Sequence, residues 1–230
     1  MQGDGLVSEV LLLDQALCAR VQCDAALVPA PGQYLLAVAD GSDAPLATVL
    51  FAGGIAHDGF LAAPPIPSTW QPGTRLLLRG PLGHGFSIPP SSRRLGLVAF
   101  GCLARTLLSL LDSVDREEVS VTLVADHIPE GLPTEVEVQP LAAVVEVSQW
   151  TDFLAVDVER SMLPGLRETL QPHRMGIKAE GQALIRTPMP CGALADCGVC
   201  TVVLGRRTYL ACADGPVFDL RQALEWSSRA

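Results

Sequence analysis

Short apolar runs bounded by Gly, Pro and Asp fill the chain from residue 7 to about residue 89, and no long helical period is present there. The strand candidates in this stretch lie within residues 7–27, 34–38, 47–51 and 75–79. β-Prone runs of this length between turn residues are typical of antiparallel barrels and sandwiches. Residues 1–90 are therefore predicted to form an N-terminal antiparallel β-barrel.

The hydrophobic pattern changes after the linker Pro89-Pro90-Ser91-Ser92, whose prolines and serines favour extended chain. The next elements read as strand, helix and strand, at residues 95–99, 103–111 and 119–125. Three more β-rich runs lie at residues 136–138, 142–147 and 153–156. A helix is expected over 159–170, provided that Pro164 lies in its first turn. The alternation predicts a central, small α/β domain with a parallel sheet over residues 91–175.

Four of the seven cysteines gather near the end of the chain in the spacing C-x5-C-x2-C-x11-C, at Cys191, Cys197, Cys200 and Cys212. This spacing is close to the plant-type [2Fe-2S] pattern of C-x4-C-x2-C with a distant fourth cysteine. Glycines in the loop can turn amide N–H groups toward a negatively charged cluster. The four cysteines are therefore predicted to ligate one [2Fe-2S] cluster.

The chain between Cys200 and Cys212 holds two β-prone runs around the turn Gly205-Arg206-Arg207. A hairpin there would return Cys212 beside Cys200. Residues 176–230 are thus predicted to form a C-terminal cysteine-rich [2Fe-2S] domain, and the whole chain an α+β multidomain fold.

Other interpretations of the cysteines stay open. A structural zinc site needs four ligands in a tetrahedron and more often shows two C-x2-C knuckles, whereas one is present here. Disulfides are disfavoured by the odd number of cysteines and the lack of a signal peptide. Cys18, Cys23 and Cys102 are interpreted as core thiols. The four histidines are scattered, and no catalytic residue is predicted.

Composition and charge narrow the class of protein. With 49% hydrophobic and 18% charged residues in 230, the chain can bury a sizeable core. Its net charge of −9 disfavours a nucleic-acid or anionic-membrane partner. The apolar run at residues 10–13 is cut by Asp14 and lacks a basic flank, so neither a secretory signal nor a membrane span is predicted there. We expect a cytoplasmic protein.

Three motifs resemble a known family. The cysteine loop with Ala-Cys-Ala-Asp-Gly-Pro-Val-Phe at 211–218 resembles the C-terminal iron-sulfur domain of the dihydroorotate dehydrogenase electron-transfer subunit, in the ferredoxin-reductase superfamily. Pro-Gly-Gln-Tyr at 31–34 and Gly-Pro-Leu-Gly-His-Gly-Phe at 80–86 resemble the strand entry and closing loop of its flavin domain. One departure is an extra residue between Cys191 and Cys197, where the family has four.

The resemblance implies a flavin-domain-like barrel, a nucleotide-binding-like sheet domain and an iron-sulfur domain, in that order. It implies an electron-transfer subunit of an oxidoreductase complex in pyrimidine biosynthesis, which passes single electrons through the cluster to a catalytic partner like dihydroorotate dehydrogenase. In relatives, a flavin takes a hydride from NADH and supplies those electrons. A partner would cover the cluster-bearing face, so residues 191–200 are expected near the surface.

The nucleotide motifs of the family are changed in this chain. Residues 46–51 stand where the family has Arg-x-x-Ser, and they contain neither residue; no Lys or Arg occurs from 21 to 74. The FAD pyrophosphate would then need backbone amides or Arg75, Arg79, Arg93 and Arg94. The glycine-rich loop is reduced to Gly101, with Phe100 and Leu103 beside it, and Asp157 and Glu159 add negative charge after a later strand. Weak or absent FAD binding and loss of nicotinamide binding are therefore predicted.

Two other functions remain as alternatives. The chain could be a non-redox assembly or regulatory subunit whose four cysteines hold structural zinc. It could instead be a complete NADH-dependent flavin reductase that uses different contacts.

Overall fold

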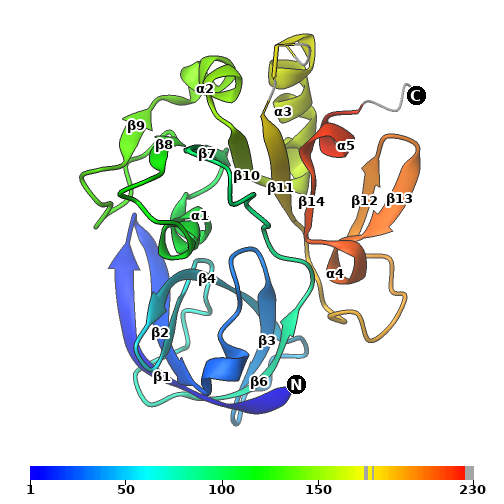
Figure 1. The fold of residues 1–230 in the computed structure, drawn as a ribbon. Coiled ribbons are helices and arrows are strands. Elements are labelled where there is room, and N and C mark those ends of the chain that lie inside the picture. Colours follow the sequence, from blue (N-terminus) through cyan, green and yellow to red (C-terminus); the bar gives the residue numbers. More distant parts are fainter. Residues whose placement is uncertain (174–175, 178, 226–230) are drawn as a thin grey trace.

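The computed structural model describes residues 1–173, 176–177 and 179–225, which form a barrel, a sheet with helices and a small hairpin (Figure 1). The strands are β1 (Gln2–Leu13), β2 (Ala16–Cys23), β3 (Tyr34–Ala39), β4 (Thr48–Ala56), β5 (Gly59–Ala62), β6 (Arg75–Leu82), β7 (Arg94–Phe100), β8 (Ser120–Val124), β9 (Glu137–Gln139), β10 (Phe153–Glu159), β11 (Glu180–Arg186), β12 (Thr201–Leu204), β13 (Arg207–Leu210) and β14 (Val217–Asp219). The helices are α1 (Arg105–Leu108), α2 (Val144–Trp150), α3 (Leu163–Leu170), α4 (Ala211–Asp214) and α5 (Leu220–Leu224).

The N-terminal unit is a closed antiparallel barrel with the strand order β1-β2-β5-β4-β3-β6, as predicted. Side chains alternate between its inside and outside: in β6, Leu76 and Leu78 are buried, whereas Arg75 and Leu77 are exposed. The predicted run over 7–27 is in fact a hairpin of two strands, and β5 was not predicted. The inward side chains of all six strands form the barrel's own core.

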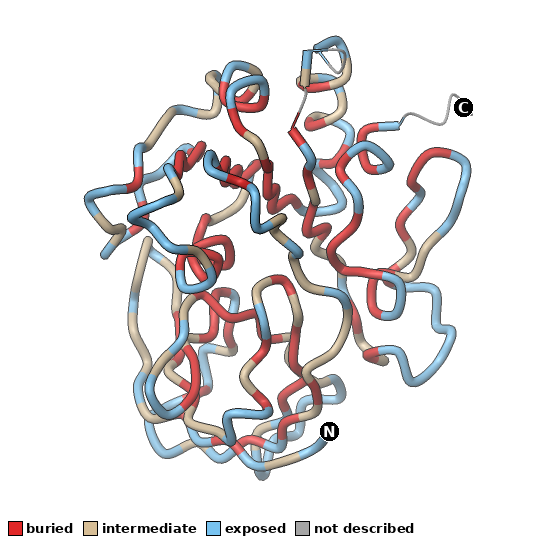
Figure 2. The backbone as a smooth tube through the Cα atoms, in the orientation of Figure 1, coloured by how far each residue is buried: buried red, intermediate tan, exposed pale blue. Residues whose placement is uncertain are grey.

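The second unit is a sheet with the strand order β14-β11-β10-β7-β8-β9, in which β14 alone runs antiparallel. The chain adds β8 and β9 on one side of β7, and then β10, β11 and β14 on the other side. In open α/β sheets, ligands bind where the strand order reverses in this way. The strand interiors are buried on both faces (Figure 2). The carboxyl ends of β10 and β11 therefore point at one edge, next to the barrel (Figure 1).

Several predicted elements need correction. The run at 142–147, expected to be β-rich, lies largely in helix α2, because Val144, Val147 and Ser148 are spaced to bury one helical face. The helix expected over 103–111 is the four-residue α1 followed by a 3₁₀ turn at Ser109–Ser113. Helix α3 begins at Leu163, so Pro164 lies in its first turn, as required.

The sheet also uses residues beyond 175, since β11 and β14 supply two of its strands. The proposed domain boundary at 175 therefore stays a prediction from sequence, and residues 226–230 of the third unit lie outside the described residues. The predicted hairpin is present as β12 and β13, with Gly205 and Arg206 in its turn. None of the helices in the described part of the chain has the length and apolar character that a membrane span requires.

Candidate metal centre and adjoining pocket

The four predicted ligand cysteines come together as two pairs. The Sγ atoms of Cys191 and Cys197 lie 3.4 Å apart, and those of Cys200 and Cys212 lie 3.2 Å apart. Within the described residues, no three or more Cys, His, Asp or Glu side chains converge on one metal position. The cysteines are therefore arranged two and two, and not as a single tetrahedron.

The loop around Cys191 is shaped by two successive residues in the left-handed region, Gly192 (φ +49°) and Ala193 (φ +65°). A Cβ on Gly192 would lie 2.2 Å from Leu36 Cδ1, so only glycine allows the loop to pack this closely on barrel strand β3. The Ala193 backbone contributes to lowering the pKa of both Cys191 and Cys212, although it is not the largest influence on either.

The two pairs differ in their electrostatics. A backbone hydrogen bond at Ala195 and the hydrogen bond from the Cys197 thiol lower the pKa of Cys191 to about 7. Burial raises the pKa of Cys212 to about 12. A thiolate is therefore favoured at Cys191, whereas Cys212 needs a positive ligand to hold it deprotonated.

The cysteine loop is anchored to the barrel by residues that the sequence analysis did not assign to this site. Arg79 Nη1 donates to Gly192 O at 2.8 Å, and the Tyr34 hydroxyl donates to Cys212 O at 3.0 Å. The His84 amide donates to Gly215 O at 2.6 Å. The loop at 80–86 and the tail at 211–218, which carried the family resemblance, therefore pack against each other.

Exposure divides the site. Cys197 is exposed and Cys191 is partly exposed, whereas Cys200 and Cys212 are 1% and 2% exposed. The expectation that residues 191–200 lie near the surface is thus correct for the first pair and wrong for Cys200. The hydrophobic residues of the hairpin and the tail cover Cys200, because the hairpin packs its Val202 and Leu204 into the sheet's core.

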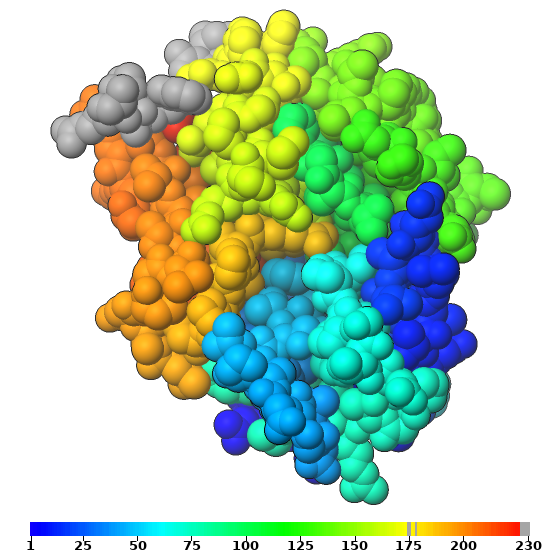
Figure 3. Space-filling view, turned by 180° about the vertical axis from the view of Figure 1, so that it is seen from behind, coloured from blue at the N-terminus to red at the C-terminus, as the bar shows by residue number. Residues whose placement is uncertain are grey.

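A pocket of about 500 Å³ lies where the barrel meets the carboxyl ends of β10 and β11. Figure 3 shows the hollow where these segments converge. Its lining residues are Thr48, Val49, Phe51, Ala63, Pro64, Pro65, Glu159, Arg160, Ser161, Arg186, Thr187 and Pro188. It includes part of the stretch 46–51, which the family resemblance placed at the flavin.

Both cations of the pocket wall are engaged within the chain. Arg186 Nε donates to Asp157 Oδ1 at 2.7 Å, while Arg160 Nη1 donates to Val199 O at 2.8 Å. Among the described residues, the one buried side-chain oxygen or nitrogen without a hydrogen-bond partner is Thr187 Oγ1, at the pocket wall. The pocket therefore suits a flat, largely apolar ring with one polar edge better than a pyrophosphate.

The arginines that sequence offered for a pyrophosphate lie elsewhere. Arg79 binds the cysteine loop, while Arg93 pairs with Glu118 and Arg94 with Asp152. Arg75 lines a separate hollow on the outer side of the barrel. None of these four is among the residues that line the pocket at the barrel–sheet junction.

The reduced glycine loop after β7 is filled by the chain's own side chains. Phe100 is buried, and a Cβ on Gly101 would lie 3.0 Å from Met162 Cε, which covers the loop. Asp157 is fully buried in its ion pair with Arg186. Contrary to the expectation from sequence, it therefore does not present negative charge to a ligand. A pyrophosphate would need to approach the backbone of this loop closely, and the Met162 side chain occupies that space.

The chain is similar in sequence to a curated electron-transfer protein. The probable dihydroorotate dehydrogenase B (NAD(+)) electron transfer subunit of Thermococcus kodakarensis is 30% identical over 173 aligned residues. The alignment covers 64% of this chain and 66% of the relative, so the chain spans just under two thirds of that protein. No family model matches the chain.

Solved structures share the fold. The structure of an NADH-dependent reduced ferredoxin-NADP oxidoreductase has a TM-score of 0.71 at 15% identity and covers 94% of this chain and 87% of its own. The ferredoxin reductase of carbazole 1,9a-dioxygenase has a TM-score of 0.59 at 16% identity, covering 79% and 68%. The ferredoxin NADP+ reductase of Neisseria gonorrhoeae has 0.55 at 12%, covering 79% and 98%. In sequence the chain is similar to a dihydroorotate dehydrogenase electron transfer subunit, and in fold it is similar to ferredoxin reductases.

Proposed function

We propose that this chain is an electron-transfer subunit that relays single electrons through a [2Fe-2S] cluster held by Cys191, Cys197, Cys200 and Cys212. The observation that carries the proposal is the arrangement of the four thiols in two pairs. A dinuclear cluster takes two thiolates on each iron, so two adjoining pairs match its donor set. A single zinc would require all four on one centre.

The surroundings of the cysteines also suit an anionic cluster. The Ala193 backbone lowers the pKa of one cysteine of each pair, and the Arg79 guanidinium donates to the adjacent carbonyl of Gly192. Amide hydrogens and a nearby cation both stabilise negative charge in a site partly closed to water. A [2Fe-2S] cluster bound there would accept and release one electron at a time.

The exposure of the outer cysteine pair and the similarity to an electron transfer subunit together indicate the kind of partner protein. Cys197 and the neighbouring Leu194 and Val199 are exposed, so the outer pair can lie close to a second redox centre on another protein. The sequence relative is an electron transfer subunit of dihydroorotate dehydrogenase. We propose a catalytic oxidoreductase subunit of that kind as the electron acceptor.

The direct test is the metal content and absorption of the chain purified without oxygen. We expect about two irons and two labile sulfides per chain, and an EPR signal after reduction with dithionite. Stoichiometric zinc without iron, with no EPR signal, would reject the relay and support the structural zinc site instead.

Flavin binding gives a second expected result. Because both pocket arginines are engaged, the pyrophosphate of FAD should add little affinity, and isolated chain should bind FAD and riboflavin with dissociation constants within about threefold of each other. Fluorescence-quenching titrations with the two compounds measure this. FAD that stays stoichiometric through gel filtration, or binds more than about tenfold tighter than riboflavin, would show that other groups hold the phosphates.

A further inference from the structure

One arginine joins the pocket wall to the cysteine site. Arg160 stands directly after β10, and it lines the pocket at the barrel–sheet junction. Its Nη1 donates to Val199 O at 2.8 Å and to Thr201 O at 2.9 Å. These are the carbonyls of the residues before and after Cys200, so a single guanidinium holds the backbone on both sides of that cysteine.

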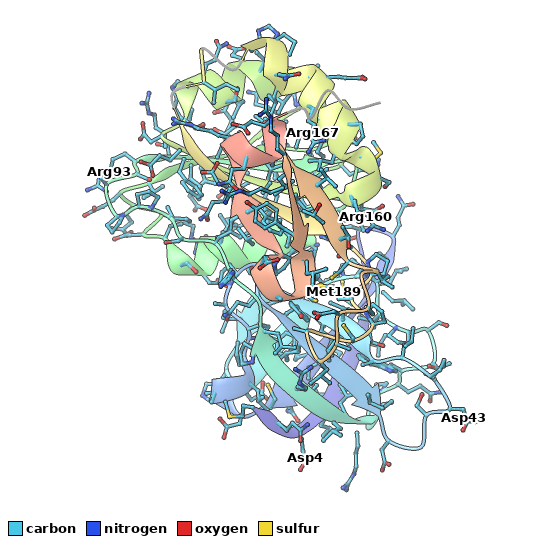
Figure 4. All side chains as sticks on the ribbon, turned by 90° about the vertical axis from the view of Figure 1, so that its right-hand side faces the viewer. Asp4, Asp43, Arg93, Arg160, Arg167 and Met189 are labelled. Carbon is cyan, nitrogen blue, oxygen red and sulfur yellow. The ribbon has the colours of Figure 1, made fainter. Side chains whose placement is uncertain are left out.

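The same edge of the hairpin carries a second arginine contact. Arg167 of α3 donates from Nη2 to Val203 O at 2.9 Å and from Nε to Ala223 O at 2.7 Å. Arginine side chains donate to the carbonyl of Val199, just before β12, and to those of Thr201 and Val203 within β12, in place of another strand. Figure 4 shows Arg160 and Arg167 along the hairpin, with Met189 at the start of the cysteine loop.

The two arginines act at different distances from the thiols. Arg167 holds the hairpin farther from the site, at Val203, and also ties it to α5. Arg160 acts on the residues that flank Cys200, which is buried and paired with Cys212. The positive charge of Arg160 therefore lies at the two backbone carbonyls that flank Cys200.

We infer that Arg160 is a positioning residue of the metal centre, which fixes Cys200 beside Cys212 and favours the reduced, more negative state of the cluster by its charge. The second half of this inference rests on the proposed electron-relay function, whereas the first half concerns the protein without metal. A cation near a centre that gains an electron raises its reduction potential.

The positioning role is tested on metal-free protein by alkylation with iodoacetamide, read at each cysteine by tandem mass spectrometry. Arg160→Gln removes two charge-assisted hydrogen bonds, so local opening at the buried Cys200 should rise and its alkylation should be about tenfold faster. Arg206→Gln is the matched control, because it removes the same charge from the exposed hairpin turn. Equal Cys200 rates in the two variants would overturn the positioning role.

The electrostatic role is tested on iron-loaded protein by redox titration followed by EPR. We expect a lower midpoint potential in Arg160→Gln, recovery of it in Arg160→Lys, which retains the charge, and no change in Arg206→Gln. A wild-type potential in loaded Arg160→Gln would overturn this role. If Arg160→Gln does not fold, Arg160→Met decides the positioning role by the same alkylation measurement, since methionine keeps an aliphatic side chain and has no donor for the two carbonyls. Wild-type protein that never binds iron would refute the relay, while the alkylation rates would still decide the positioning role.

Discussion

Replacement of Cys200 by serine is expected to abolish most iron and labile sulfide binding in protein purified without oxygen. Cys200 is buried and paired with Cys212, so a substitute ligand cannot move in from solvent without opening the hairpin. A serine alkoxide is a poor match for iron that prefers thiolate. Iron and sulfide measured per chain, with the EPR amplitude after reduction, quantify the loss.

Cys102→Ser is the control for this result. Cys102 is also a poorly exposed thiol, but it lies outside the site, where burial raises its pKa and its Sγ donates to Asp157 O at 3.3 Å. The Cys102 variant should keep wild-type iron. Equal iron in the Cys200 and wild-type proteins would rule out Cys200 as a ligand, and thermal unfolding of both metal-free variants separates ligand loss from misfolding.

The cysteine site was largely predictable because its information is local. The positions of the cysteines within one loop and the hairpin that follows it are fixed by spacing, by Gly192 and by the turn at Gly205. The burial of Cys200 was not predictable in this way. It depends on how the hairpin packs on the sheet, which no short-range pattern encodes.

The supporting arginines were missed for a different reason. Arg79, Arg160 and Arg167 all donate to backbone carbonyls, and a carbonyl belongs to every residue, so the acceptor leaves no mark in the sequence. Charge alone would assign such residues to the surface or to a phosphate. Their partners are visible only once the fold brings distant segments together.

The errors in secondary structure have local causes. The valines of α2 have high β propensity. The segment is nevertheless helical, because its buried positions repeat with the spacing of one helical face. In the barrel, β5 has only four residues and closes the sheet by pairing with β2 and β4. A strand this short is specified by its neighbours.

Replacement of Arg186 by leucine is expected to lower the free energy of unfolding by about 3–5 kcal/mol, because it leaves the Asp157 carboxylate buried without its partner. Asp157 is fully buried, and Arg186 also donates from Nη2 to Thr106 Oγ1 at 2.7 Å and from Nη1 to Pro64 O at 3.3 Å. Burial lowers the pKa of Arg186, but the attraction of Asp157 outweighs it and the pKa is raised, so the arginine stays charged. This one side chain therefore joins the sheet, α1 and the barrel beside the pocket.

Urea unfolding followed by circular dichroism measures the change. Arg94→Leu is the matched control, because Arg94 pairs with Asp152 at 2.6 Å with 46% and 33% of the two side chains exposed, and an exposed pair contributes about 1 kcal/mol or less. The double variant Arg186→Leu with Asp157→Leu removes both charges and should recover much of the loss. If Arg186→Leu unfolds at the same urea concentration as Arg94→Leu, the buried pair does not hold the junction between the barrel and the sheet.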